Sequence, residues 1–300
     1  MSPSNQPRPT RAERTAAARE KARQIREAQL KKEKRNKLLL RWGVVVALVA
    51  VIAIVALVIT TTMRQNAPIA DSGPSPANMN ANGGITLGKG TAVTAAPAAN
   101  VNLTSVPTPT AQPTASQAAN APGVEAAPKG QPAKVVVYVD FICPVCGDFE
   151  KTNGDTLTQL RNDGKITLEY RPIGFLDSRS TTNYSSRAAA AAACVANAYP
   201  DKYADFFNDL YTQQPAEGSA GLSDQQLKDI ASKRGADISK CVDDKTYRPF
   251  VKYTTALAAA SGVTGTPTAF VDGKQWGIGD SAKQSFQDFL KADLDARAKA

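Results

Sequence analysis

One stretch decides the fold: Val135-Val-Val-Tyr-Val-Asp-Phe-Ile-Cys143-Pro144-Val145-Cys146, an apolar, β-branched run that ends in Cys-x-x-Cys. The run predicts a buried strand, and the residues after it have the pattern of a helix. This spacing places the sulfur of Cys143 at the open N-terminus of the helix and the sulfur of Cys146 one turn inside it. The sequence therefore predicts a redox-active dithiol, in which Cys143 is the nucleophile and Cys146 resolves the mixed disulfide.

The dipeptide between the cysteines supports this interpretation. Pro144 suits the first helical position, where its missing N–H is not needed, and Val145 completes a Cys-Pro-Val-Cys motif. The alternatives for this spacing are a structural zinc site and a structural disulfide. A zinc site needs further ligands, but the other cysteines, Cys194 and Cys241, stand alone and the chain contains no histidine. We therefore expect no metal and no cofactor.

The composition excludes several classes of function. Without histidine, the chain has no Ser-His-Asp or Cys-His catalytic site and no covalent c-type haem attachment. The net charge of +9 suggests nucleic-acid binding, but residues 1–41 hold the whole excess, with 13 basic and 4 acidic residues. The rest of the chain is neutral and poor in aromatic residues, so we expect no nucleic-acid partner.

Residues 1–62 predict a membrane anchor. Residues 1–41 form a basic segment of strong helix formers, and residues 42–62 are uncharged and apolar. At about 1.5 Å per residue the uncharged stretch spans roughly 31 Å, the thickness of a bilayer core. A cleaved signal peptide is the alternative, but no Ala-x-Ala-like site follows the stretch. Because basic flanks stay inside, we expect a single-pass protein of the cell membrane with a cytoplasmic N-terminus and an extracytoplasmic body.

Residues 63–133 predict a disordered linker between the anchor and the body. They are rich in Pro, Ala and Thr and contain ten of the nineteen prolines. Such a composition buries too little apolar surface to order itself, and a flexible chain of this length reaches roughly 45 Å. The exception is Gly84-Ile-Thr-Leu-Gly88, where residues 85–88 are expected to form a short first strand, detached from the body by a looped insert.

Residues 134–298 predict an α/β body. The first strand, the dithiol helix and a second strand at 165–170 form a β-α-β unit. A helical region of about 178–262 follows, in which Ser223 and Gln226 predict a capping box. The chain then returns to a β-hairpin around Asp272-Gly273 and a final helix at 281–298. Pro267 stands immediately before the first hairpin strand, a place where a cis peptide bond is expected.

This arrangement resembles the DsbA-like branch of the thioredoxin superfamily, and most of all the membrane-anchored thiol:disulfide oxidoreductases of actinobacteria. The resemblance covers residues 134–298 and depends on the Cys-Pro-x-Cys motif, on Asp140 ahead of it and on Gly265-Thr266-Pro267-Thr268. It implies a thioredoxin-like fold with an inserted α-helical domain. It also implies a cis Pro267 beside the dithiol, with Thr266, where the backbone pairs with the substrate chain.

The resemblance implies a function as well. An extracytoplasmic oxidoreductase of this kind introduces disulfide bonds into unfolded exported proteins and is reoxidised by a VKOR-like or DsbB-like membrane partner. A disulfide reductase or isomerase is the alternative, because the sequence does not determine the direction of exchange and Thr266 also occurs in isomerase branches. An alternative of another class is a membrane-tethered binding or chaperone module with structural cysteines.

One departure from the family affects the nucleophile. Many DsbA proteins have histidine where this chain has Val145, so the Cys143 thiolate lacks a charge partner and keeps the helix terminus. We expect a pKa of Cys143 below the free value of about 8.5, but less depressed than the value of about 3.5 in the strongest oxidant of the class. The protein is therefore expected to be a weaker oxidant than that relative. Cys143 is expected to be exposed at the surface.

Three further residues are assigned roles. Asp140 is a candidate for moving the proton of Cys146, since burial can raise the pKa of a carboxyl group; a solvated aspartate at the strand end is the alternative. Cys194 and Cys241 are expected to form a structural disulfide within the helical insertion, because an even number of cysteines suits an exported body. Two free thiols or a second exchange site are the alternatives.

Overall fold

The computed structural model describes residues 11–108 and 121–299, and the chain divides into two units after Arg64. The first unit is a long helix, α1 (Arg11–Gln65). Among the described residues, it is the one helix long and apolar enough to cross a membrane, by length and composition. The basic segment and the apolar stretch that the sequence predicts are therefore parts of one continuous helix.

The second unit is built on a five-stranded sheet in the order β2-β5-β4-β6-β7. β4 and β5 are parallel, as the β-α-β pattern predicts, and the other neighbouring pairs are antiparallel. In the central strand Val135 lies between Leu168 of β5 and Val271 of β6, and all three are buried. The strands are β2 (Ile85–Leu87), β4 (Ala133–Val139), β5 (Ile166–Pro172), β6 (Thr268–Val271) and β7 (Lys274–Gln275).

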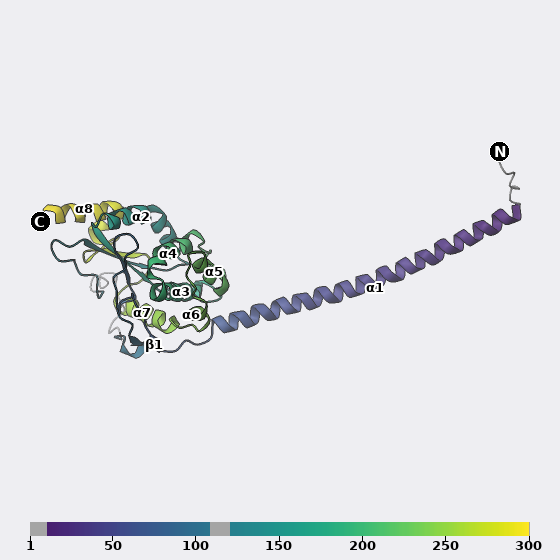
Figure 1. Ribbon diagram of the computed structural model, residues 1–300, viewed down its shortest axis with the longest axis horizontal. Helices are drawn as coiled ribbons and strands as arrows, with labels where there is room; N and C mark the ends of the chain where they lie inside the picture. Colours follow the sequence, from purple (N-terminus) through teal and green to yellow (C-terminus); the bar gives the residue numbers. More distant parts are fainter. Residues whose placement is uncertain (1–10, 109–120, 300) are drawn as a thin grey trace, which may run out of the picture. The chain divides into compact units, whose positions relative to one another are not determined.

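Helices cover both faces of this sheet (Figure 1). α2 (Pro144–Asn162) and α8 (Phe286–Lys299) lie on one face, where the rings of Phe149 and Phe286 are 4.9 Å apart. α7 (Arg248–Ala260) lies on the other, where Ala258 joins an apolar cluster with Val136 and Phe270. The final helix begins at Phe286 rather than at residue 281, because a 3-10 turn at Gly279–Ser281 precedes it.

The helical insertion is organised around α3 (Tyr184–Ala198), which is buried along almost its whole length. Its alanine-rich sequence explains this burial, since small side chains allow neighbouring helices to approach closely from several sides. The predicted capping box is present at the start of α5, where Ser223 and Gln226 bond each other's backbone N–H groups. The surrounding helices are α4 (Tyr203–Thr212), α5 (Asp224–Lys233), α6 (Ser239–Asp243) and α7.

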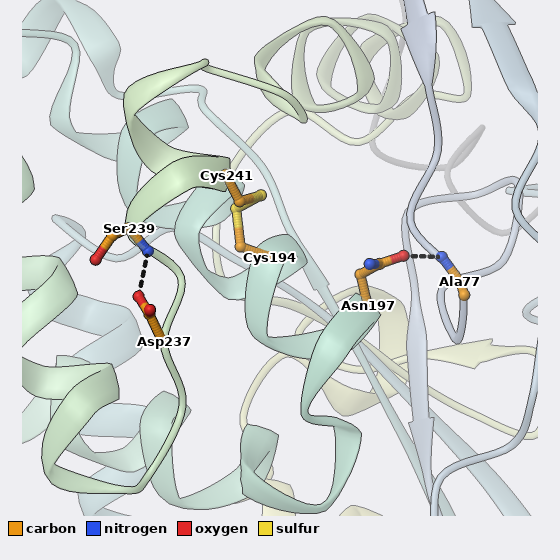
Figure 2. The surroundings of a disulfide bond; sticks show 6 residues. All are labelled: Ala77, Cys194, Asn197, Asp237, Ser239 and Cys241. Carbon is orange, nitrogen blue, oxygen red and sulfur yellow. Dashed lines mark hydrogen bonds between the residues drawn. A yellow bond between two sulfur atoms is a disulfide. The ribbon is translucent and has the colours of Figure 1, made fainter.

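A disulfide bond joins α3 to α6 within the insertion. Figure 2 shows Cys194 and Cys241 bonded, with an S–S distance of 2.00 Å and a sequence separation of 47 residues. Closing a loop of this length removes entropy from the unfolded chain and contributes about 4 kcal/mol to stability. The bond therefore holds a small, alanine-rich helical layer together.

The prediction of a disordered linker over 63–133 is wrong for most of its length. Residues 66–108 are ordered: β1 (Ser72–Pro74) pairs with β3 (Asn100–Asn102), and β2 pairs with β5 as the outer strand of the main sheet. Met79, Ile85 and Leu87 are buried in the main core. Residues 121–133 are also ordered, and residues 109–120 of the predicted linker lie outside the described residues.

Hydrogen bonds to α3 explain how so polar a segment becomes ordered. The backbone N–H of Ala77 donates to Asn197 over 3.0 Å, as Figure 2 shows, and the Asn78 side chain donates to the Ala196 carbonyl over 2.9 Å. The average composition of the segment underestimates its order, because a few apolar side chains at the right positions and a set of amide hydrogen bonds are sufficient to dock it.

Candidate active site

The dithiol lies where β4 runs into α2. Cys143 is the N-cap residue of α2 and has extended backbone angles, while Pro144 takes the first helical position. The backbone N–H groups of Cys146 and Gly147 both donate to the Cys143 carbonyl, at 3.1 and 3.2 Å, and close the first turn. Cys143 and Cys146 are not bonded to each other. The local sequence signals therefore place both sulfurs as the spacing predicts.

The Cys143 side chain is less exposed than the sequence suggests. The residue is 5% exposed and Cys146 is fully buried. The cover comes from the loop before β6, where the Cys143 thiol donates to the Thr266 carbonyl over 3.2 Å. The peptide bond between Thr266 and Pro267 is cis. The structure thus brings together the dithiol and the Thr266-Pro267 pair, which are more than a hundred residues apart in the chain.

The two thiols have opposite acidities. The pKa of Cys143 is lowered to about 6, first because the Cys146 thiol donates a hydrogen bond to the Cys143 sulfur, and then through the Thr266 side chain and the backbone N–H groups of Val145 and Cys146. Burial opposes this shift. The pKa of Cys146 is raised far above its ordinary value by its own burial and by the neighbouring Cys143. Cys143 is therefore the group that carries charge in the reduced protein.

A titration of the reduced protein checks this assignment. We expect one thiolate, at Cys143, to appear with a midpoint near pH 6 in ultraviolet absorbance, and to be absent from Cys143→Ser. Because this pKa is depressed, the thiolate stabilises the reduced fold above the ordinary thiol pKa, and the contribution is lost as pH falls through 6. Val145→His should lower the midpoint further, since Val145 is 60% exposed and a cation at this position would stabilise the neighbouring Cys143 thiolate. A midpoint above 8 would contradict the assignment.

Asp140 is buried next to the dithiol loop. The alternative interpretation, in which it is a solvated aspartate at the strand end, is therefore wrong. It is 0% exposed, and its carboxylate accepts hydrogen bonds from the backbone N–H groups of Ile142, at 3.1 Å, and Leu176, at 2.9 Å. Burial raises the pKa of Asp140 to about 7. A carboxyl group with this pKa exchanges protons near neutrality, within a few residues of Cys146.

Two elements of the site have no signal in the sequence. Gln214, just beyond α4, donates its side-chain amide to the carbonyls of Phe141, at 3.2 Å, and Cys143, at 2.8 Å. On α2, one turn beyond Cys146, Glu150 accepts a 2.8 Å hydrogen bond from the Tyr170 hydroxyl, and burial raises the pKa of Glu150 to about 7. These contacts join distant elements, so local patterns could not reveal them. Cys194 and Cys241 pair with each other and take no part in the site.

Comparisons with known proteins identify the family of this fold. The family described as thioredoxin matches residues 121–292. DsbA from Mycobacterium tuberculosis, in its reduced form, is 30% identical and is matched over 94% of its length and 59% of this chain, with a TM-score of 0.47. DsbG from the same organism, also reduced, is 32% identical over 84% of its length and 56% of this chain, with a TM-score of 0.46.

Two curated proteins, a kinase and a probable disulfide bond formation protein, are also similar in sequence to this chain. The serine/threonine-protein kinase PknE of Mycobacterium tuberculosis is 31% identical over 151 residues, which are 47% of this chain and 26% of PknE. The chain thus spans about a quarter of the length of that kinase. A probable disulfide bond formation protein D from Bacillus anthracis is 24% identical over 56% of this chain and 75% of its own length.

The thioredoxin match extends over more than half of the chain, which therefore belongs to the thioredoxin family. The sequence identity to DsbA from Mycobacterium tuberculosis runs along nearly the whole of that protein.

Proposed function

We propose that this protein introduces disulfide bonds into exported proteins. The observation that carries the proposal is the contrast between the two thiols beside the cis Thr266-Pro267 bond: Cys143 has a lowered pKa at a helix N-cap, and Cys146 is buried with a raised one. A thiolate stabilised in the reduced protein makes Cys143 a good leaving group and shifts the equilibrium toward oxidation of the client.

The exchange proceeds in two steps. A client thiolate attacks the Cys143 sulfur of the Cys143–Cys146 disulfide, the S–S bond breaks, and Cys146 leaves and takes up a proton. A second client thiolate then attacks the client sulfur of the mixed disulfide and releases Cys143 as its thiolate. The client loses two electrons, and the dithiol gains them.

The two electrons that the Cys143/Cys146 dithiol gains must then pass to a membrane partner. We propose a VKOR-like or DsbB-like protein that reoxidises the Cys143/Cys146 dithiol at the outer face of the cell membrane. The apolar stretch of α1 suits a single-pass anchor, and the 13 basic residues before it favour a cytoplasmic N-terminus. Anchoring both proteins in one membrane raises their effective concentration for each other.

The equilibrium redox potential tests the direction of exchange. We expect the full-length protein in detergent, equilibrated with glutathione, to give a value between about −120 and −180 mV, where the protein donates disulfides. Alkylation and peptide mapping would follow Cys194 and Cys241 separately, so that only the active dithiol is scored. A value near −270 mV would make the protein a reductase and overturn the proposal.

Asp140 is proposed to supply the proton that Cys146 takes up. Its pKa of about 7 predicts that exchange slows as pH rises through 7, and that Asp140→Asn removes this inflection from the rate profile. Because this carboxyl pKa is raised by folding, its protonated form stabilises the fold at low pH, and the contribution is lost as pH rises through 7. Glu150→Gln is the matched control, with the same pKa in the parent. An inflection that survives in Asp140→Asn and disappears in Glu150→Gln would assign the proton to Glu150.

A further inference from the structure

A second feature of the structure lies beside the dithiol and has no part in the exchange steps. A cavity of about 630 Å³ runs between α2 and α4. It begins at Gly147 and Gln214, next to the first turn of α2, and ends at Arg161 in the last turn of α2. Its size lies within the range of sites that bind small molecules or peptide segments.

The sequence of α2 opens this cavity. Gly147, Glu150, Gly154 and Arg161 recur at intervals of three, four and seven residues, which places them on one face of the helix. Glycine inside a helix is destabilising relative to alanine, so two glycines on one face need a reason. At Gly147 a β-carbon would lie too close to the side-chain oxygen of Gln214, whereas at Gly154 it would lie in ordinary contact, 3.5 Å from the Glu150 carboxylate.

Two side chains in the cavity lining have buried polar atoms that lack a hydrogen-bond partner among the described residues. Arg161 is 5% exposed, and within residues 11–108 and 121–299 its Nε and Nη1 atoms have no hydrogen-bond acceptor. The Oε1 atom of Glu150 is also shielded and without a donor there, although Oε2 is bonded to Tyr170. A buried charge without a partner is costly. The last turn of a helix is a favourable position for the Arg161 cation, but this position does not supply a hydrogen-bond acceptor for the guanidinium. The cavity therefore lacks a hydrogen-bond acceptor for Arg161 at one end and a hydrogen-bond donor for Glu150 toward the other.

The rim of the cavity restricts where a negative charge fits. Asp148 is exposed near the dithiol and Asp155 is exposed farther along α2, with Lys151 between them on the same helix. Asp205, across the cavity, lies 3.9 Å from Arg234 and is partly neutralised. A client carboxylate is therefore disfavoured near Asp148, at the dithiol end, and favoured at the buried guanidinium of Arg161.

We propose that the cavity between α2 and α4 binds an extended segment of the client protein, with a carboxylate of the client at Arg161 and a client N–H donating to Glu150. The proposal rests on the proposed function and names a preference among its clients. Arg161 follows Cys143 by 18 residues, about 27 Å along the helix axis, and its side chain points back toward the N-terminus. The remaining span of roughly 20 Å corresponds to about six residues of extended chain. The preferred client has an acidic residue about six positions from its reactive cysteine.

Matched peptides test this spacing in the oxidised full-length protein in detergent. Single-cysteine peptides of Ala, Ser and Gly would carry Glu or Gln six residues from the cysteine, on either side, or two residues from it. We expect the peptide with Glu at six to form the mixed disulfide about tenfold faster than its Gln counterpart, the factor given by a hydrogen bond between charged groups. Glu at two should give no gain over Gln.

Variants assign the effect to Arg161. Arg161→Met should abolish the preference for Glu at six without lowering the melting temperature, since no hydrogen bond is lost. Lys151→Met removes the same charge from an exposed site on the same helix and should keep the preference. If both variants lost the preference for Glu equally, the effect would be one of long-range charge, and the proposed carboxylate site at Arg161 would be overturned.

Two further outcomes separate the proposals. Equal rates for Glu and Gln at six, with normal exchange otherwise, would overturn the client site and leave the proposed function intact, whereas no exchange with any thiol would overturn the proposed function. Competition by N-acetylglutamate at the peptide's own concentration would assign the cavity to a free small carboxylate and overturn binding of a client segment.

Discussion

Cys146→Ser is expected to accumulate mixed disulfides with client proteins, whereas Cys143→Ser is expected to form none. In the first variant the Cys143 thiolate, with its pKa of about 6, still attacks an oxidised client, but no buried thiol remains to resolve the bond. In the second, the remaining Cys146 thiol is fully buried and its pKa is raised, so it is neither accessible nor ionised. Oxidation of a reduced client should fall by at least about a thousandfold in both variants, the scale typical of a lost nucleophile.

Non-reducing gels with mass mapping of trapped species provide the measurement. Val145→Ala is the control within the motif, because this side chain is 60% exposed and bonds to neither sulfur; it should form no trapped species and retain most of its activity. Trapping through Cys146 in Cys143→Ser would reverse the two roles. It would require the Thr266-Pro267 loop to move away and expose the second sulfur.

The double variant Ile85→Ala, Leu87→Ala is expected to destabilise the body by at least about 4 kcal/mol, because each large-to-small change in a core costs about 2–5 kcal/mol. Both side chains belong to β2 and are 0% and 3% exposed. They pack into the main core from a strand that pairs Ile85 with Tyr170 and Leu87 with Leu168 of β5. Urea unfolding of the full-length protein in detergent would measure the loss.

An exposed neighbour provides the control for this experiment. Thr94→Ala changes an exposed side chain just beyond β2, whose backbone N–H still donates to the Thr86 carbonyl, and should leave stability within about 0.5 kcal/mol of the parent. If the double variant were as stable as Thr94→Ala, residues 66–108 would be a tether after all. The same reasoning predicts that a soluble fragment beginning near residue 131 lacks its edge strand and folds poorly.

The parts of this structure that the sequence predicts well are those with local causes. The N-cap position of Cys143 and the first-turn place of Pro144 follow from a motif four residues long, and the strands and helices around it follow from periodicity. The capping box at Ser223 is equally local. Such signals depend on neighbours in the chain, so a single sequence is sufficient to find them.

The parts that it predicts poorly depend on distant contacts. Cys143 is covered because Thr266, 123 residues later, returns to its sulfur, and no local pattern shows this cover. Gln214 and the unpartnered Arg161 become notable only once α4 lies beside α2. The short strand at 85–88 is expected from the sequence, but the order of the rest of residues 66–108 is not, because average composition does not show which few contacts dock a polar segment.

The place of β2 in the sheet also affects how the protein is made. Ile85 leaves the ribosome 85 residues before Tyr170, its partner in β5, and at about 5–20 residues per second the strand waits roughly 4–17 s for that partner. During this interval a bare apolar strand risks pairing with other chains. The proline- and glycine-rich sequence on both sides of β2 cannot extend the strand, and so protects the nascent chain from aggregation until the sheet can close.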